Sequence, residues 1–479
     1  MNLKTMRLVA LLTIGLPALF FGTASATFLY RIHQQNSLHN VIPLKTTPAP
    51  SAQKRLLIFT PHPDDETLGC AGIIHQAITR GASVDVCIIT NGDGFRMGVE
   101  RQYRKVRVGS EDFIRFASLR QKEADIALGF CGLSSDHISF MGYPDQGLMP
   151  LWQKYWSPGD LYTSNSTGFD HSPYPVCSHP GAQYCGQSLL DDIRTAILKY
   201  RPTDVYVTHP SDDHPDHSAA SAFVYLALSQ ISKEQEGWAN ECKLHYYLVH
   251  RGDWPVPQGM DRNAEMTPPG EMTSLDTNWK ELPLSDSDVE VKTHAIGAYA
   301  SQTAMMKRFL FSFVRRNEIY GDLPVAEVPR RGPEMVPLLL DPTNDTLIRD
   351  FQGGADISAI YAMCKGENLI VKVNTTRQLA PNVQMDIQFR YFGDRHNEGV
   401  GGQFDLSIKG NGAGNGGGIA SKLQKDGVQL IIPLRMLNYS HLASIAVTTR
   451  ASGISVDKTG YRFFRIAPFT LQARKGVDN

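Results

Sequence analysis

The sequence has no surplus of charge of either sign, few cysteines and only one long apolar run. Lysine and arginine number 47 against 48 aspartate and glutamate, for a formal net charge of −1. A chain without a basic surplus lacks the field that attracts phosphate backbones, so no nucleic-acid partner is expected. The length of 479 residues, with 42% hydrophobic and 20% charged residues, is typical of a globular protein of two or three domains. This balance excludes a coiled coil, a mostly disordered chain and a multi-pass membrane protein.

The long apolar run lies at the N-terminus and is typical of an export signal. Lys4 and Arg7 precede an apolar stretch over residues 8–22, and Ala24-Ser25-Ala26 follows as a small-x-small cleavage site. We therefore expect residues 1–26 to be a signal peptide. The alternative is an uncleaved N-terminal anchor, because residues 8–30 carry no charge. Both place the rest of the chain outside the cytoplasm, as a periplasmic, secreted or membrane-anchored protein, and only the anchor makes a membrane a partner.

Cysteine is scarce, and the count of seven is odd, so not every thiol can pair within the chain. Cys70 and Cys87 lie in apolar runs, where a buried free thiol is expected. Cys177 and Cys185 flank a loop rich in proline, glycine and histidine. In an oxidising compartment, a disulfide between these two cysteines would close that loop.

A first domain of the α/β class is predicted after a polar, proline-containing linker over residues 27–54. Short apolar runs typical of buried strands alternate with helical spacing from residue 55 onward, and we expect the last helix over Met306–Arg316. This alternation predicts a doubly wound, Rossmann-like parallel sheet over residues 55–325. Residues 148–187 are rich in aromatics and show no periodicity, which predicts an insertion within the domain.

The pattern changes after a second linker, predicted over residues 326–340 from its repeated prolines. Apolar and polar residues alternate strictly over Val383–Tyr391, and similar short runs separated by turn residues follow. Residues 341–472 are therefore predicted to form an all-β, sandwich-like domain.

Histidine and aspartate follow two of the predicted strands of the first domain. One loop spans residues 62–66, and the other spans residues 209–217. Because the carboxyl ends of parallel strands meet at one edge of a sheet, these loops can converge on one point. His62, Asp65 and His217 would then offer two imidazoles and a carboxylate to a metal ion, with positions left open for water and substrate. We expect one Zn²⁺ per chain, with other divalent metals as alternatives.

Two neighbours of these ligands have the chemistry for catalysis. Asp64 could take a proton from the attacking water as a general base. His214 could stabilise an oxyanion or protonate the leaving group, and Asp212, Asp213 and Asp216 are expected to orient the ligating imidazoles. The alternative for the acids of the first loop is that they only complement the positive end of the following helix, which would not explain the histidine.

The two motifs resemble those of a known family. His62-Pro63-Asp64-Asp65-Glu66 and His214-Pro215-Asp216-His217 are similar to the hallmark motifs of the PIG-L/LmbE-like zinc deacetylases, which remove acetyl groups from N-acetylglucosamine-containing compounds. The resemblance covers about residues 55–325 and leaves the β domain outside. It implies zinc ligands at His62, Asp65 and His217, a base at Asp64, and a residue that assists the tetrahedral intermediate at His214.

Two more segments resemble the family. Arg120-Gln-Lys-Glu123 is similar to a helix whose arginine contacts substrate, and Tyr143-Pro-Asp145-Gln-Gly147 to a loop whose aspartate contacts sugar hydroxyls. The resemblance thus implies that Arg120 and Asp145 bind substrate. Pairing of Arg120 with Glu123 or another neighbour is the alternative.

The leading hypothesis is an exported, zinc-dependent N-deacetylase that hydrolyses the acetamide of N-acetylglucosamine-type sugars in a glycan or glycoconjugate. One alternative is a catalytically inert glycan-binding or surface protein whose β domain performs the recognition. Another is a non-haem Fe(II) oxygenase, since two histidines and one carboxylate also form the metal set of those enzymes. The ligand spacing on an α/β sheet argues against the oxygenase, and a base beside a complete metal set argues against the inert protein.

Overall fold

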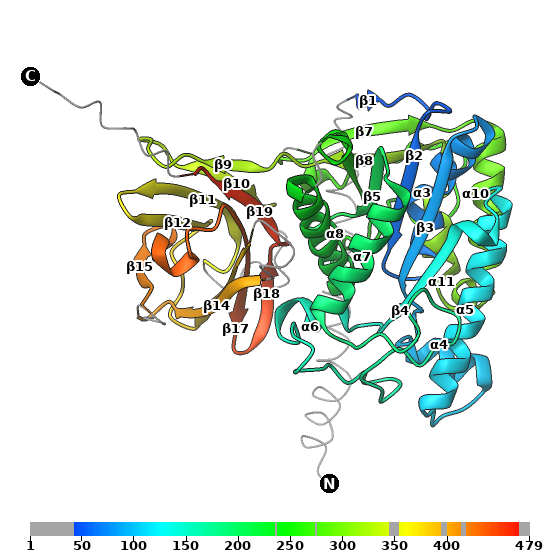
Figure 1. The fold of residues 1–479 in the computed structure, drawn as a ribbon, viewed down its shortest axis with the longest axis horizontal. Helices are drawn as coiled ribbons and strands as arrows, with labels where there is room; N and C mark the ends of the chain where they lie inside the picture. The colour runs from blue at the N-terminus through cyan, green and yellow to red at the C-terminus, as the bar shows by residue number, and fades with distance from the viewer. Residues whose placement is uncertain are drawn as a thin grey trace, which may run out of the picture.

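The computed structural model describes residues 43–234, 237–273, 275–343, 354–393, 400–412 and 418–468. Within these ranges the chain forms an α/β domain and a C-terminal β domain that lie side by side (Figure 1). No helix in the described ranges combines the length and the apolar character needed to cross a membrane. The predicted signal peptide, residues 1–26, lies outside the described residues.

An eight-stranded sheet in the order β1-β7-β8-β6-β5-β2-β3-β4 forms the centre of the first domain. Strands β2 to β6 pair in parallel, which confirms the predicted doubly wound sheet, whereas β8 runs antiparallel to both β6 and β7. The strands are β1 (Lys45–Thr46), β2 (Arg55–Thr60), β3 (Ser83–Thr90), β4 (Ile138–Tyr143), β5 (Asp204–Thr208), β6 (Lys243–Tyr247), β7 (Asn278–Pro283) and β8 (Asn317–Asp322).

Helices cover both faces of this sheet because side chains alternate along its strands. Leu56 and Ile58 join an apolar core with α3, α5 and α10, whereas Leu57 and Phe59 join a second core with α6, α7 and α8. The helices are α3 (Asp65–Thr79), α4 (Arg96–Tyr103), α5 (Ser110–Phe130), α6 (Leu148–Gln153), α7 (Gly186–Tyr200), α8 (Pro215–Glu234), α9 (Trp238–Glu241), α10 (Asp286–Ala298) and α11 (Ala300–Leu310).

The last helix of this domain differs from its prediction. A helix was expected over Met306–Arg316, but α11 begins at Ala300 and ends at Leu310, where a 3₁₀ turn over Phe311–Phe313 follows. The apolar spacing that suggested a longer helix continues through this turn, and Phe313 is buried in the core from there.

Two sheets form the C-terminal domain, in the orders β10-β11-β12-β16-β15 and β14-β13-β17-β19-β9, with β18 paired to β17. Ile360 and Val371 of one sheet share an apolar core with Ile387 and Val447 of the other, which confirms the predicted sandwich-like architecture. The strands are β9 (Ala326–Val328), β10 (Val336–Leu340), β11 (Ile357–Lys365), β12 (Asn368–Thr375), β13 (Val383–Phe392), β14 (Val400–Lys409), β15 (Ala420–Gln424), β16 (Gly427–Pro433), β17 (Leu442–Ala451), β18 (Ile454–Lys458) and β19 (Arg462–Ile466).

Both predicted linkers contain strands. Residues 326–340 include β9, which pairs with β19, and β10, which pairs with β11. Pro337 fits within β10 because this strand lies at the edge of its sheet. Proline has no backbone N–H, and an edge strand does not need one on its open side. Within residues 27–54, β1 pairs with β7. The prolines that suggested linkers therefore mark sheet edges.

The two domains share one apolar core. Trp152 of α6 is fully buried, and its ring centroid lies 5.7 Å from that of Phe392 and 5.6 Å from that of Tyr461. Phe463 lies 4.4 Å from Tyr225 of α8 by the same measure. The start of the predicted insertion at residues 148–187 is thus a buried helix that joins the domains, and its tryptophan packs in the core.

The predicted disulfide between Cys177 and Cys185 is not formed, and both thiols are free. The sulfur of Cys177 lies 3.2 Å from the carbonyl oxygen of Tyr174, and that of Cys185 lies 3.2 Å from the hydroxyl of Ser188. Each thiol therefore has its own polar neighbour, and the loop is held by backbone hydrogen bonds such as the one from Ser172 to the carbonyl of Ala182.

Candidate metal centre and active site

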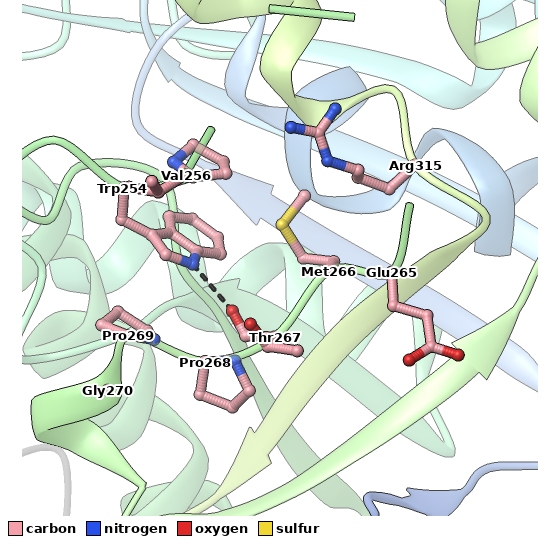
Figure 2. A pocket seen from close by; sticks show the side chains of 10 residues that line it. Trp254, Val256, Glu265, Met266, Thr267, Pro268, Pro269, Gly270 and Arg315 are labelled. Atoms are coloured by element: carbon pink, nitrogen blue, oxygen red, sulfur yellow. Dashed lines mark hydrogen bonds between the residues drawn. The ribbon is translucent and has the colours of Figure 1, made fainter. Parts of the chain in front are cut away.

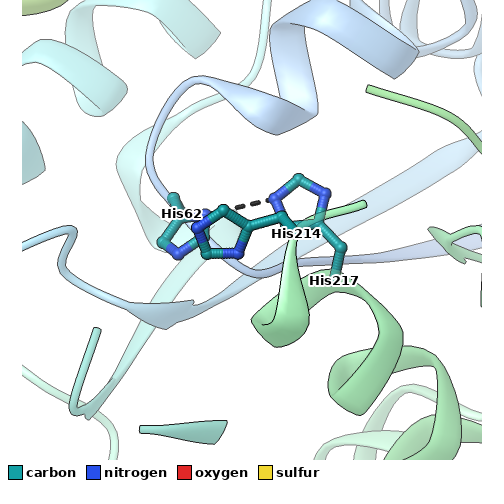
Figure 3. Close-up of side chains that lie close together, drawn as sticks. All are labelled: His62, His214 and His217. Atoms are coloured by element: carbon teal, nitrogen blue, oxygen red, sulfur yellow. Dashed lines mark hydrogen bonds between the residues drawn. The ribbon is translucent and has the colours of Figure 1, made fainter. Parts of the chain in front are cut away.

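The two histidine-aspartate loops meet because β2 and β5 are neighbours in the sheet. Ile58 pairs with Tyr206 in parallel register, so both strands end at the same edge. The first loop then leads into α3, and the second leads into α8. Figure 3 shows His62 from the first loop facing His214 and His217 at the start of α8.

The three predicted ligands form a tight cluster of donor atoms. His62 Nδ1 lies 3.2 Å from Asp65 Oδ2 and 3.2 Å from His217 Nε2, and His217 Nε2 lies 3.1 Å from Asp65 Oδ2. Four-coordinate zinc with bonds of about 2.0–2.1 Å holds its ligand atoms about 3.3 Å apart. These separations suit one zinc-sized ion, and the three side chains that would hold it are buried.

The electrostatics of the cluster favour a positive charge. His217 Nδ1 lies 3.2 Å from Asp212 Oδ2, so Nε2 is the nitrogen that faces the cluster. Burial alone would lower the pKa of His217, but the carboxylates of Asp212 and Asp65 raise it to about 9. A metal ion would supply the same compensation in place of that proton.

Asp64 sits beside the cluster in a constrained backbone conformation. Its φ angle is 125°, a region that residues with a Cβ rarely adopt. Its Oδ1 lies 3.3 Å from Arg120 Nη2. Burial raises the pKa of Asp64 to about 7 against the opposing effect of Arg120, so this carboxyl group can exchange a proton at neutral pH.

His214 is placed to donate a hydrogen bond. Its ring lies edge-on to that of His62, with centroids 4.7 Å apart. Burial and the neighbouring His62 and His217 lower the pKa of His214 to about 4, so the imidazole is neutral at pH 7. Its Nδ1 accepts a hydrogen bond from the backbone N–H of Asp216 at 3.2 Å, which leaves the proton of the neutral ring on Nε2.

Arg120 and Asp145, the two predicted substrate-binding residues, both contact the metal-site loops. Arg120 donates to the carbonyl oxygens of Pro63 and Gly92 and is buried. Asp145 Oδ1 lies 3.2 Å from His62 Nε2. Each therefore helps to hold the loop of the first motif, and their contact with substrate remains a prediction.

The three aspartates of the second loop make different contacts. Asp212 faces His217 and also accepts the backbone N–H of Val249 at 3.0 Å. Asp216 Oδ2 lies 3.3 Å from His62 Nε2. Asp213 was expected to orient an imidazole as well, but its carboxylate accepts the backbone N–H of Gly252 and pairs with Arg251 instead.

Two residues of the site were missed by the sequence analysis. Asp93 is buried and accepts the backbone N–H of Asp145 at 3.1 Å, and burial raises its pKa to about 7. The ring centroid of His250 lies 5.0 Å from that of His217, and His250 forms a further possible ligand group with Asp65 and His217. Asp93 follows β3 and His250 follows β6, each by three residues. A search for polar residues after the end of every predicted strand would therefore have found both.

A small cavity elsewhere in this domain is not a substrate site. It lies beside Trp254, whose Nε1 donates to the carbonyl of Thr267 at 2.8 Å, and is flanked by Met266 and Arg315 (Figure 2). Its volume of about 20 Å³ accommodates no more than a water molecule.

Comparison with known proteins agrees with the motifs. Residues 57–228 match the family model PIG-L, described as GlcNAc-PI de-N-acetylase. A 1D-myo-inositol 2-acetamido-2-deoxy-alpha-D-glucopyranoside deacetylase of Mycobacterium sp. (strain KMS) is 30% identical over 182 residues, which cover 37% of this chain and 53% of the relative. The corresponding protein of Kribbella flavida is 25% identical over 293 residues, covering 56% and 90%.

A glucosamine-6-phosphate deaminase-like protein of Bacteroides thetaiotaomicron is 20% identical over 267 residues. The match covers 52% of this chain and only 36% of that relative's length. Among solved structures, the N,N'-diacetylchitobiose deacetylase of Pyrococcus horikoshii is 17% identical with a TM-score of 0.34, covering 56% of this chain and 82% of that one.

Proposed function

We propose that the protein is a zinc-dependent N-deacetylase, because residues 57–228 match the PIG-L family model, described as GlcNAc-PI de-N-acetylase. Its substrate would be an N-acetylglucosamine-type sugar within a glycan or glycoconjugate. The observation that carries the proposal is the cluster of His62, Asp65 and His217, whose donor atoms lie 3.1–3.2 Å apart beside a carboxyl group with a pKa of about 7. The named sugar deacetylases among its relatives support the choice of substrate class.

In this proposal His62, Asp65 and His217 hold the metal. Bound zinc would supply a Lewis acid that polarises the acetamide carbonyl and lowers the pKa of water. Asp64 takes the proton of the water that attacks the carbonyl carbon. The neutral His214 donates from Nε2 to the carbonyl oxygen, which becomes negative during the attack. A fixed donor at this oxygen stabilises the developing charge and so lowers the barrier.

The reaction ends with cleavage of the bond between the carbonyl carbon and nitrogen. The proton that Asp64 accepted passes to the departing nitrogen, so the products are acetate and a free amine. Arg120 keeps Asp64 in place, since its guanidinium contacts Asp64 Oδ1 and the carbonyl of Pro63. These residues would thus hold the metal, orient the base and move one proton.

Export is the second part of the proposal. It rests on Lys4, Arg7, the apolar run over residues 8–22 and the Ala24-Ser25-Ala26 site. The protein would then act in the periplasm, outside the cell or on a membrane anchor. Cell fractionation, with mass spectrometry of the mature N-terminus, tests this part. A full-length chain recovered in the cytoplasm would refute it.

Acetate release tests the activity. The purified, zinc-loaded chain is incubated with N-acetylglucosamine oligomers and conjugates, and the product amine is counted against acetate. Asp64→Ala should retain zinc and lose turnover, whereas His217→Ala should lose both, because only the second removes a ligand. A fully active Asp64→Ala would refute the proposed mechanism, and no release from any substrate by a zinc-loaded chain would favour the inert glycan-binding alternative.

A further inference from the structure

A cleft of about 230 Å³ lies between the two domains, next to the candidate active site. Met149 and Gln153 of α6 and the loop around Asp212 line it from the α/β domain, and Arg450 and Lys458 line it from the β domain. In Figure 1, β17 and β18 of the β domain face α6 and α8 across this boundary.

The cleft adjoins the loops that hold the metal cluster. Asp212 lines the cleft and also contacts His217 Nδ1 and the backbone N–H of His214, at 3.2 and 3.0 Å. Met149 follows Leu148, whose N–H donates to Asp216 Oδ1 at 3.0 Å. The wall that belongs to the α/β domain is therefore built on segments that contact the metal-site loops, and the opposite wall belongs to the β domain.

The lining of the cleft suits a carbohydrate. Hydroxyl and amide side chains line the cleft together with apolar residues such as Met149, a combination that matches sugar hydroxyls and the apolar faces of sugar rings. The polar groups come from both domains, so the cleft exists only when the domains are packed together. They are Gln153, Ser211, Ser218, Gln388, Thr448, Ser455, Thr459 and Tyr461.

Three cationic residues, Arg251, Arg450 and Lys458, line the cleft together with one acid, Asp212, and this balance favours an anion. Lys458 Nζ donates to the main-chain carbonyl of Asp213 at 2.6 Å, and this acceptor is neutral. Arg450 pairs through Nε with Asp386 at 2.9 Å. Its side chain is 43% exposed, so the two Nη groups can reach a ligand. A carboxylate and a guanidinium can form two parallel hydrogen bonds, which are strong and directional.

We propose that this interdomain cleft is a subsite for sugar units that extend beyond the reacting N-acetyl sugar, and that it selects units bearing a carboxylate. The inference rests on the proposed function for the position of the reacting sugar. In this proposal the β domain takes a direct part in substrate choice, and Arg450 is the residue that binds the acidic group.

Calorimetric titration of the full chain tests this assignment without relying on turnover. The probes are a hexasaccharide that alternates glucuronate with N-acetylglucosamine and a neutral N-acetylglucosamine hexamer, titrated into Asp64→Ala protein to prevent hydrolysis. We expect the acidic hexasaccharide to bind at least tenfold more tightly than the neutral one. Arg450→Glu should weaken its binding at least tenfold, with Arg450→Gln intermediate, because a charge-assisted contact becomes repulsive.

Arg435→Glu is the matched control. Arg435 is an exposed arginine of the same domain, on the 3₁₀ helix Leu434–Leu437, and does not line the cleft. Equal binding of the two probes, or an equal loss in Arg435→Glu and Arg450→Glu, would overturn the inference. Acetate release, measured in parallel on the wild type, separates the two claims: release without selective binding leaves the deacetylase and removes the subsite, and selective binding without release does the opposite.

Discussion

Glu66 accepts a hydrogen bond from the backbone N–H of Asp64 at 3.0 Å, in a position fully buried from solvent. Its second oxygen accepts the hydroxyl of Tyr299. Asp64 has a φ of 125°, and a strained backbone of this kind persists only when its surroundings hold it. The third acid of the first motif, Glu66, therefore supports the first, Asp64, which is the proposed base.

Glu66→Ala should reduce both stability and turnover while the metal ligands stay in place. The N–H of Asp64 would lose its partner in a buried position, which costs about 1–3 kcal/mol. We expect the free energy of unfolding in urea to fall by that amount and kcat to fall more than tenfold. Glu66→Gln, which keeps an oxygen acceptor, should recover part of both, and an Ala variant with wild-type kcat would contradict this role.

Gly460 should be essential to the geometry of the second motif. A Cβ at Gly460 would lie 1.9 Å from the carbonyl oxygen of Pro210, so any side chain must push apart the β domain and the loop that leads to His214 and His217. We expect Gly460→Ala to weaken zinc binding at least tenfold in competition with a chromophoric chelator. Gly412→Ala, in the same domain, has open space around its new Cβ and should bind zinc as the wild type does. Equal affinity in the two variants would show that the β domain does not hold this loop.

Zinc should stabilise the fold through the three-ligand cluster. A ligand at 100 times its Kd adds about 2.7 kcal/mol to the stability of the folded state. Chelation should therefore lower the Tm of the wild type by several degrees and leave that of Asp65→Ala unchanged. His250→Ala keeps the three ligands and should retain the shift in calorimetry. If the shift disappears in His250→Ala, then His250 is itself a ligand.

The charged group formed by Lys54, Asp204 and His245 predicts how stability depends on pH. Burial would raise the pKa of Asp204, but hydrogen bonds from His245 and Lys54 hold it well below its usual value. Burial would lower the pKa of His245, but the carboxylates of Asp204 and Asp322 raise it. The aspartate therefore stabilises the fold above about pH 4 and loses this effect as pH falls through its folded pKa, whereas the histidine stabilises it below about pH 6.5 and loses this effect as pH rises through its folded pKa.

Both contributions are complete between about pH 4 and pH 6.5. His245→Gln should therefore lower the free energy of unfolding most at pH 5.5 and least at pH 8.5. Urea unfolding of the wild type and the variant at these two values measures the difference. A difference that does not change with pH would show that His245 carries no charge in the folded protein.

Sequence reasoning could bring the three proposed metal ligands together because each follows the end of a strand, and the carboxyl ends of parallel strands meet at one edge of the sheet. It did not place Arg120, since a buried guanidinium turns toward whichever carbonyls the tertiary fold provides, here those of Pro63 and Gly92. The packing of the two domains against each other was equally beyond local patterns. Trp152 and Phe392 lie in the same core but belong to segments with different periodicities, and no window of sequence contains both.

That shared core leads to the last prediction, which concerns the chain ended at residue 325. Trp152 is fully buried, and its neighbours Phe392 and Tyr461 belong to the β domain. Without that domain the tryptophan and the adjoining face of α8 would be exposed, at a cost of about 25 cal/mol for each Å² of apolar surface. We expect the shortened chain to bind the dye ANS and to unfold at a lower urea concentration than a chain ended at residue 468, which keeps every described residue of the interface. A shortened chain with the same midpoint and no dye binding would show that the domains are independent, and it would also remove the basis for a cleft built by both.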